Sequence, residues 1–447
     1  MPNIAALTVN HCMYPNLYYL FKDIFGVNWP FLKIINTFGF FVALSFLAAA
    51  WVLIKELKRK QAQGIFTYTE TTITVGQPAS IGELLTNFIL GFILGYKIIG
   101  VLFVKHALDD PQAFIFSSNG SFPVGLVLGL LLAGLKYWEK NKVKLAKPEQ
   151  RKIRIWPSDR VGDVTIIAAV AGFAGAKIFD NLENWDRFIK DPLGNLISPM
   201  GLTFYGGLIV ATLALWFYFK KRNISFINIC DAAAPALILA YGLGRIGCQV
   251  AGDGDWGIIN SAYISDVEGN TVLAHPGQYD VTIKTYSYIY RETGNPDTAI
   301  QHASVKAFAG LPKWLVAYSY PHNVNKTGIP TMGCTFDDYC NHLPLPVFPT
   351  PLYEIIMALG ITAFLWGIRK KITIPGRMFA IYLMFNGVER FLIEQIRVNT
   401  RYTFLSFLGI YPTQAEIISL SLFLAGVILY WYAPKIKSKA TPKPQEA

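Results

Sequence analysis

The amino-acid sequence predicts an all-α polytopic membrane protein with about nine transmembrane helices. Of its 447 residues, 53% are hydrophobic and only 15% are charged, which is too apolar for an ordinary soluble protein. Nine apolar windows are also long enough, at about 17 to 24 residues, to cross the hydrocarbon core as helices. These windows cover residues 31–54, 85–105, 121–138, 163–181, 202–219, 232–251, 351–368, 376–396 and 413–433.

The distribution of lysine and arginine predicts how these helices are oriented, because short loops rich in these residues stay in the cytoplasm. With nine spans and an external N-terminus, every basic cluster falls inside. The clusters lie at 55–60, 136–154, 220–222, 369–371 and in the C-terminal tail. The net charge of +11 is thereby explained by topology. A nucleic-acid partner is not expected, since the basic residues are scattered over loops.

The spans and loops divide the chain into six predicted segments. They are an N-terminal outer segment with the first transmembrane helix (1–58), an extra two-helix hairpin with a basic cytoplasmic loop (59–160), core helices (161–257), a periplasmic insertion (258–350), C-terminal core helices (351–434) and a basic cytoplasmic tail (435–447). The insertion is predicted to be partly β, because residues 279–290, YDVTIKTYSYIY, are strand-like. The insertion at 258–350 either forms a cap over a site that contacts an incoming substrate protein, or is a species-specific insertion without a function at the site.

An internal repeat links the extra hairpin to the core. GFILGYKI at 91–98 resembles AGFAGAKI at 171–178, and Gly125 aligns with Gly206 at an offset of about 80 residues. Either a helical hairpin has been duplicated, or glycine-rich membrane helices resemble each other by chance. The first copy is interpreted as structural.

Polar residues converge at one predicted depth in the outer leaflet. Asn386, Arg390, Glu394 and Arg397 fall at i, i+4, i+8 and i+11, which predicts one polar helix face. Either Arg390 and Glu394 satisfy each other while Arg397 snorkels to lipid headgroups, or the face lines a site. Arg245, a second intramembrane arginine at matching depth, favours a site because it leaves cationic charge that needs an anion. The plentiful anion there is a phospholipid phosphate, which guanidinium binds bidentately.

Glycines and aspartates flank Arg245. Gly242, Gly244 and Gly247 either make room for a lipid headgroup or serve ordinary helix packing. Asp253 and a second aspartate two residues later are interpreted mainly as a turn, with cation coordination or arginine orientation as alternatives.

The cysteines and histidines predict little chemistry. Cys248 is interpreted as an inert packing residue rather than a nucleophile or acyl carrier. Cys334 and Cys340, in the outer segment, are expected to form a disulfide. We expect no metal and no cofactor, because the six histidines lack ligand spacing and no nucleotide-binding motif occurs.

Four motifs in order resemble those of the prolipoprotein diacylglyceryl transferase family. They are LTFYGGL at 202–208, GLGRIGCQVAGDGDWG at 242–257, PTPLYE at 349–354 and GVERFLIEQIR at 387–397. The resemblance covers most of residues 163 to 433, together with NTFGFF at 36–41 in the first helix. It implies seven family-like helices and an enzyme of the bacterial inner membrane. That enzyme moves the diacylglyceryl group of phosphatidylglycerol to the lipobox cysteine thiol of a preprolipoprotein and releases glycerol phosphate.

The resemblance also implies site residues. Arg245 and Arg390 match the family's signature arginine and its late essential arginine. The further matching positions are Gly206, Gly207, Gly257, Tyr353, Glu354, Glu394 and Arg397. With Gly247, Cys248, Asp253 and Asn386, these residues form the expected substrate-binding and catalytic set.

Four positions depart from the family pattern. Tyr205 stands in place of a histidine, Cys248 of an asparagine, and Phe38 and Asn386 of tyrosines. The histidine has been considered a base for the thiol. Either Tyr205 orients the substrate instead, or the chemistry needs no histidine base.

We therefore expect an arginine clamp at the site. Arg245 and Arg390 would stabilise the charge that develops on the leaving phosphate and raise the thiolate fraction of the attacking cysteine. Glu394 would orient one arginine, and Tyr205 would hydrogen-bond the substrate. The alternative is a non-catalytic lipid-binding protein or lipid transporter on the same scaffold, in which the four departures mark lost chemistry.

Overall fold

The structure is a computed structural model that describes residues 13–108, 111–198, 201–291, 300–399, 402 and 411–436. Most of the first predicted segment is therefore described, whereas nearly all of the predicted tail at 435–447 lies outside the described residues. The chain forms two compact units. Within the described residues, unit 1 spans 13–56 and 227–436, and unit 2 spans 57–226.

Both units consist of helices and short strands. In unit 1 they are α1 (Leu17–Phe25), α2 (Thr37–Ala62, whose last residues enter unit 2), α10 (Phe226–Ala251), α11 (Gln278–Tyr290), α12 (Thr350–Ile368), α13 (Arg377–Glu394) and α14 (Gln414–Tyr432). In unit 2 they are α3 (Ile81–Ile93), α4 (Pro111–Phe116), α5 (Phe122–Lys142), α6 (Val161–Glu183), α7 (Trp185–Lys190), α8 (Pro192–Ile197) and α9 (Phe204–Lys221). The strands are β1 (Thr69–Val75), β2 (Glu149–Ile155), β3 (Ile259–Asn260), β4 (Tyr263–Ser265), β5 (Thr271–Leu273), β6 (His302–Ala303), β7 (Ile329–Pro330) and β8 (Asn341–His342).

Seven of the described helical segments are long and apolar enough to cross a membrane. They are Thr37–Ala62, Ile81–Leu102, Phe122–Lys142, Pro157–Glu183, Phe226–Ala251, Thr350–Ile368 and Gln414–Lys435. The chain is thus a helical, polytopic membrane protein. The other two predicted windows also form helices, α9 and α13, each of 18 residues. α9 ends in two lysines and α13 carries four charged residues. Both helices are therefore less apolar than the seven candidate spans.

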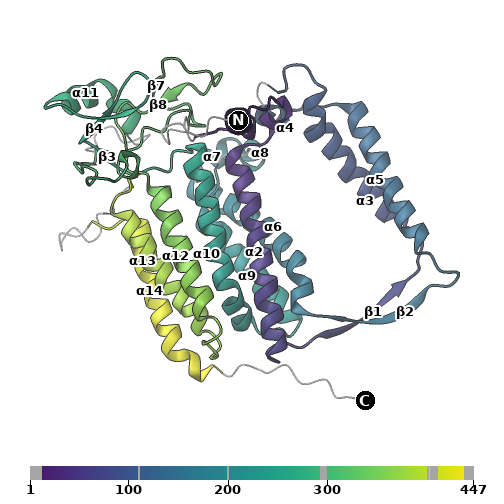
Figure 1. The fold of residues 1–447 in the computed structure, drawn as a ribbon. Helices are drawn as coiled ribbons and strands as arrows, with labels where there is room; N and C mark the ends of the chain where they lie inside the picture. The colour runs from purple at the N-terminus through teal and green to yellow at the C-terminus, as the bar shows by residue number, and fades with distance from the viewer. Residues whose placement is uncertain are drawn as a thin grey trace. The chain divides into compact units, whose positions relative to one another are not determined.

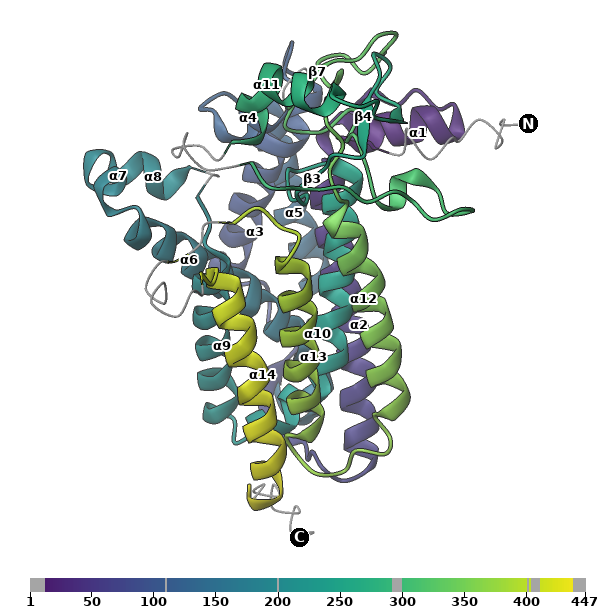
Figure 2. The same cartoon turned by 90° about the vertical axis from the view of Figure 1, so that its left-hand side faces the viewer.

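In unit 1, the long helices form a bundle. Figures 1 and 2 show α2, α10, α12, α13 and α14 running alongside one another, with α11 and the short strands at one end.

Asp231 of α10 fixes the start of α13, since its carboxylate accepts the backbone N–H groups of Gly376 (2.8 Å) and Phe379 (2.9 Å). Small residues then let the helices approach: a Cβ on Gly387 would lie 2.6 Å from the carbonyl oxygen of Ser419 in α14.

The end of the bundle carries a small folded segment between α10 and α12. Its strands pair as β3 with β6, β4 with β5, and β7 with β8, and its core includes Tyr318, Tyr320, Leu343 and Leu345. The segment is therefore partly β. The predicted disulfide is confirmed, because Cys334 is bonded to Cys340.

The strand predicted at 279–290 is wrong, because this stretch forms helix α11. Its β-branched and aromatic residues favour strands in isolation. However, Tyr279, Ile283 and Tyr290 follow a helical spacing and pack on the buried cluster of the segment. Tertiary packing thus outweighs local propensity.

Unit 2 contains two helical hairpins with the same central contact. In the first, Gly95 lies in the helical turn that directly follows α3 (Leu94–Ile99), and a Cβ on it would lie 2.8 Å from Cα of Gly125 in α5. In the second, a Cβ on Gly175 of α6 would lie 2.5 Å from the carbonyl oxygen of Gly206 in α9. These glycines occupy equivalent places in the repeated sequence, and the duplication stays a prediction. β1 and β2 form an antiparallel ribbon, with Thr69 opposite Ile155.

We predict that Gly175→Ala destabilises unit 2, because the added methyl group would collide with the backbone of α9. Overpacking of this kind costs about 1–3 kcal/mol. The measurement is the thermal midpoint of the purified protein in detergent. Gly172→Ala is the matched control on the same helix, since its Cβ would meet no atom closer than 3.9 Å. Equal midpoints for the two variants would contradict the close contact.

Candidate functional site

Glu354 is the centre of an ion-pair cluster within unit 1. Its side chain has 0% exposure, and its carboxylate lies 2.9 Å from Nε of Arg245, 3.6 Å from Nη1 of Arg390 and 3.8 Å from Nη1 of Arg397. The contact with Arg245 is an ion pair rather than a directed hydrogen bond, since Oε2 of Glu354 has no hydrogen-bond partner among the described residues. Three arginines therefore meet around one buried carboxylate.

Three helices bring these charges together. Arg245 lies in the last two turns of α10, Glu354 in the first turns of α12, and Arg390 in the last two turns of α13. Arg397 follows α13 and pairs by a β-bridge with Gly257. Arg390 and Arg397 of the predicted stripe thus contact Glu354 of α12. Figure 2 shows that α13 ends on the side of the bundle where the small folded segment lies.

Asp255 links two of the arginines. Its Oδ2 pairs with Nη1 of Arg245, and its Oδ1 pairs with Nη2 of Arg397. The hydroxyl of Thr350 donates to the carbonyl of Asp255 (3.0 Å), and Asp253 accepts the N–H of Asp255 (3.2 Å). Asp253 therefore shapes the turn, as predicted, whereas Asp255 orients arginines. Burial raises the pKa of the Asp253 carboxyl above its ordinary value.

Glu394 holds Arg390 from the other side. It accepts from Nη2 of Arg390 at 3.0 Å, and its second oxygen accepts from Asn399 and Thr413, each at 2.6 Å. Its side chain has 0% exposure. These contacts match the orienting role predicted for Glu394, and the hydrogen bonds to its second oxygen fix the carboxylate itself.

The expectation that Arg245 leaves a cation without an internal partner is wrong. Asp255 and Glu354 contact it, and Glu394 and Glu354 contact Arg390. The Arg390–Glu394 pair and arginine orientation by the aspartates were among the alternatives that the sequence offered. The contacts of Glu354 were not, because they join α12 to α10 and α13. The side chains of Arg245, Arg390 and Arg397 nevertheless remain 17%, 22% and 15% exposed. Each of the three side chains is thus partly accessible.

Other predicted site residues in unit 1 support the backbone around the cluster. A Cβ on Gly257 would lie 2.6 Å from the carbonyl oxygen of Ile396, and Gly247 lies against Phe38 and Phe41 of α2. These positions need glycine for close packing. The described contacts thus favour the packing interpretation of Gly247.

Three further predicted residues lie near the cluster or on its helices. The buried Cys248 accepts a weak hydrogen bond from Arg245 at 3.7 Å. The hydroxyl of Tyr353 donates to the carbonyl of Leu315 at 2.5 Å, which ties α12 to the small folded segment. Asn386 is half-buried on α13.

Tyr205, Gly206 and Gly207 belong to unit 2 and are described only there. The two glycines are buried between α9 and α6, where a Cβ on Gly206 would lie 2.3 Å from Cβ of Phe179. Tyr205 is half-buried and packs edge-on against Phe204. The structure therefore gives both glycines a packing role, and their predicted contact with substrate stays a prediction.

Tyr241 and Glu389 also belong to the site, although no sequence pattern pointed to them. The hydroxyl of Tyr241 lies 2.9 Å from Oε1 of Glu354 and 3.1 Å from Oε1 of Glu389. Glu389 precedes Arg390 and lies off the predicted polar stripe, and Tyr241 reads as an ordinary apolar helix residue. Only the contacts of Tyr241 with Glu354 and with Glu389, across three helices, reveal them.

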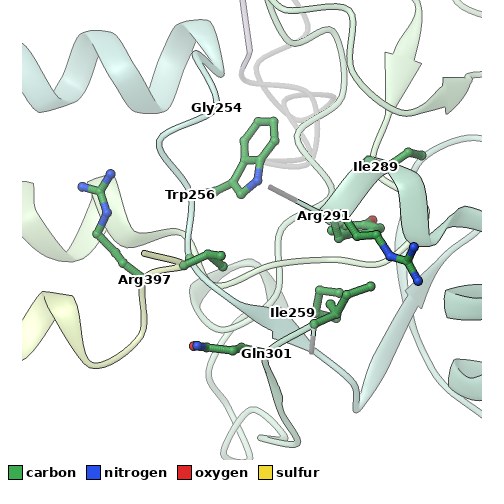
Figure 3. A pocket seen from close by; sticks show the side chains of 11 residues that line it. Gly254, Trp256, Ile259, Ile289, Arg291, Gln301 and Arg397 are labelled. Carbon is green, nitrogen blue, oxygen red and sulfur yellow. The ribbon is translucent and has the colours of Figure 1, made fainter. Parts of the chain in front are cut away.

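A pocket of about 250 Å³ adjoins the cluster. It is lined by Gly254, Trp256, Gly257, Ile259, Ile289, Tyr290, Arg291, Ile300, Gln301, Arg397 and Val398. Figure 3 shows Arg397 and Arg291 on opposite sides, with Trp256 between them. The pocket thus connects the arginine cluster with α11 and β3 of the small folded segment.

Comparison with known proteins identifies the family. A sequence model described as prolipoprotein diacylglyceryl transferase matches residues 121–432. Similar curated proteins, each named phosphatidylglycerol–prolipoprotein diacylglyceryl transferase, include those of three bacteria. The protein of Dehalococcoides mccartyi (strain BAV1) is 26% identical over 75% of this chain and 97% of its own length. That of Clostridium novyi is 25% identical over 71% and 92%, and that of Leptospira interrogans 28% identical over 59% and 59%.

The family match covers all four motifs and the whole ion-pair cluster, from Arg245 to Arg397. It extends through both arginine-bearing helices and the segment between them. The chain belongs to the prolipoprotein diacylglyceryl transferase family.

Proposed function

We propose that this protein transfers the diacylglyceryl group of phosphatidylglycerol to the lipobox cysteine thiol of preprolipoproteins and releases glycerol phosphate. The observation that carries the proposal is the meeting of Arg245, Arg390 and Arg397 around buried Glu354. The names of the curated relatives support the two substrates. Membrane lipids surround its transmembrane helices.

The reaction places new charge where guanidinium groups stabilise it best. The cysteine sulfur forms a bond to the glyceryl carbon, and the bond between that carbon and the phosphate oxygen breaks. The departing glycerol phosphate gains negative charge, and the thiol proton is released. Arg245 and Arg390, held in place before the lipid arrives, stabilise that charge without having to reorganise.

The buried carboxylates serve this arrangement. An arginine has five N–H donors in a rigid fork, so a carboxylate on one edge leaves donors for a phosphate on another. Asp255, Glu354 and Glu394 fix the forks, and the partly exposed sides of the arginines receive the lipid phosphate. Positive charge beside the thiol also favours its thiolate, which makes a histidine base unnecessary.

The topology we propose has nine crossings: the seven long apolar segments together with α9 and α13. α13 packs closely on α14, and α9 packs closely on α6, so neither helix stands alone in the membrane. Basic loops then lie in the cytoplasm, the N-terminus outside and the C-terminus inside the bacterial inner membrane. The segment 258–350 is periplasmic, and its pocket beside Arg397 contacts the incoming lipoprotein.

A non-catalytic lipid-binding protein or lipid transporter is the alternative that the departures from the family pattern leave open. Tyr205, Cys248, Phe38 and Asn386 are those departures. Lipid binding is expected of either protein, so turnover decides between them. Labelled phosphatidylglycerol and a lipobox peptide, incubated with the purified protein in detergent, give that measurement.

We predict that Arg245→Lys lowers transfer by roughly 10²–10³-fold, because a point charge cannot replace the bidentate fork. The assay is transfer of the labelled diacylglyceryl group to the peptide. Arg151→Lys, at an exposed position on β2, is the control and should transfer normally. Tyr205→Phe should only reduce transfer. A fully active Arg245→Lys variant would rule out the clamp.

Asp255→Asn should lower transfer by roughly 100-fold while phosphatidylglycerol still binds, because Arg245 and Arg397 lose the carboxylate that positions them. Transfer and lipid binding are measured on the same preparation. Asp338→Asn is the matched control, since Asp338 pairs with Lys326 at a side chain that is 77% exposed. Equal activity in both variants would argue against positioning by Asp255.

We predict that a fluorescent reporter which folds only in the cytoplasm is active when fused to the C-terminus. Nine crossings with an external N-terminus require this orientation. A periplasmic phosphatase reporter at the same place is the reciprocal control and should be inactive. The opposite pattern would overturn the proposed topology.

A further inference from the structure

The hydroxyl of Tyr241 lies between two buried glutamates that belong to different helices. Its Oη is 2.9 Å from Oε1 of Glu354 on α12 and 3.1 Å from Oε1 of Glu389 on α13. Glu354 and Glu389 are 0% and 2% exposed. A phenol thus bridges two carboxyl groups inside the bundle, where water does not separate their charges.

The number of protons decides which contacts are hydrogen bonds. A phenol hydroxyl has one proton to donate, and an ionised carboxylate can only accept. If both glutamates were ionised, one of the two contacts would bring oxygen lone pairs together without a proton between them. If one carboxyl is protonated, it donates to Tyr241, Tyr241 donates to the other, and both contacts are hydrogen bonds.

The surroundings indicate which carboxyl carries the proton. Glu354 lies within 3.8 Å of nitrogen atoms of Arg245, Arg390 and Arg397, so its ionised form is stabilised. Glu389 makes no ion pair within the part of the chain that the structure describes, and its Oε2 is buried there without a hydrogen-bond partner. Burying an unpaired carboxylate is costly, whereas a neutral acid avoids most of that cost.

We propose that Glu389 is held in its protonated form and acts as a positioning residue through Tyr241. The carboxyl of Glu389 donates to Tyr241, whose hydroxyl donates to Oε1 of Glu354. Glu354 is thereby fixed with Oε2 toward Arg245. The consequence for catalysis rests on the proposed function, but the protonation state does not.

A neutral Glu389 also keeps the site receptive to an anion. The three arginines contact three carboxylates, Asp255, Glu354 and Glu394. An ionised Glu389 would add a fourth negative charge next to them and would repel a phosphate. A protonated Glu389 supplies the hydrogen bond without that charge.

The test compares Glu389→Gln with Glu389→Leu. Glutamine is neutral and its amide can donate to Tyr241, so this variant should retain most of the transfer activity. Leucine fills a similar volume but donates nothing, so kcat should fall roughly 10-fold to 100-fold with KM for phosphatidylglycerol little changed. Tyr241→Phe should cause a similar loss, and the Tyr241→Phe, Glu389→Leu double variant should lose little more. A glutamine variant as impaired as the leucine variant would overturn the proposal.

A second measurement does not depend on activity or on the leucine variant. The infrared spectrum of the wild-type protein should contain a carbonyl band of a protonated carboxylic acid that is missing from Glu389→Gln at the same pH. Identical spectra would also overturn the proposal. If the wild type shows this band but transfers nothing, the proposed function fails while the protonation of Glu389 stands.

Discussion

The site depends on the burial of one carboxylate among three guanidinium groups. Glu354 is inaccessible to solvent and contacts Arg245, Arg390 and Arg397, which reach it from two other parts of the chain. Arginines inside a membrane are costly unless they are paired, and buried Glu354 is costly unless cations surround it. Each group therefore stabilises the others. Removing one of the four would leave a charge of the cluster without one of its partners.

Further polar contacts hold the surrounding helices in place. Asp231 fixes the start of α13, and the hydrogen bond from Tyr353 to Leu315 fixes the start of α12. Glycines at helix contacts bring the backbones close enough for side chains to meet. The ends of the helices are thus held more firmly than apolar packing alone would hold them, as a site for charged chemistry requires.

The sequence predicted the parts of this site that a single helix contains, and missed those that arise between helices. The spacing of Arg390, Glu394 and Arg397 is visible in one stretch, and so is the placement of Arg245 at a similar depth. The roles of Tyr241 and Glu389 arise from contacts across more than a hundred positions, which no local pattern encodes. The wrong strand at 279–290 has a related cause, because the packing surface beneath α11 comes from distant residues.

The two hairpins of unit 2 show what a self-contained contact permits in evolution. Each closes on its own pair of glycines, Gly95 with Gly125 and Gly175 with Gly206, so a copy brings with it the contact that it needs to fold. The hairpins also differ: Asp180 in the second forms an ion pair with Arg187 at 2.6 Å, whereas the positions 80 residues earlier, Gly100 and Ala107, are uncharged. A hairpin that closes on its own contact needs no new partner when it is copied, which is the physical basis of the predicted duplication.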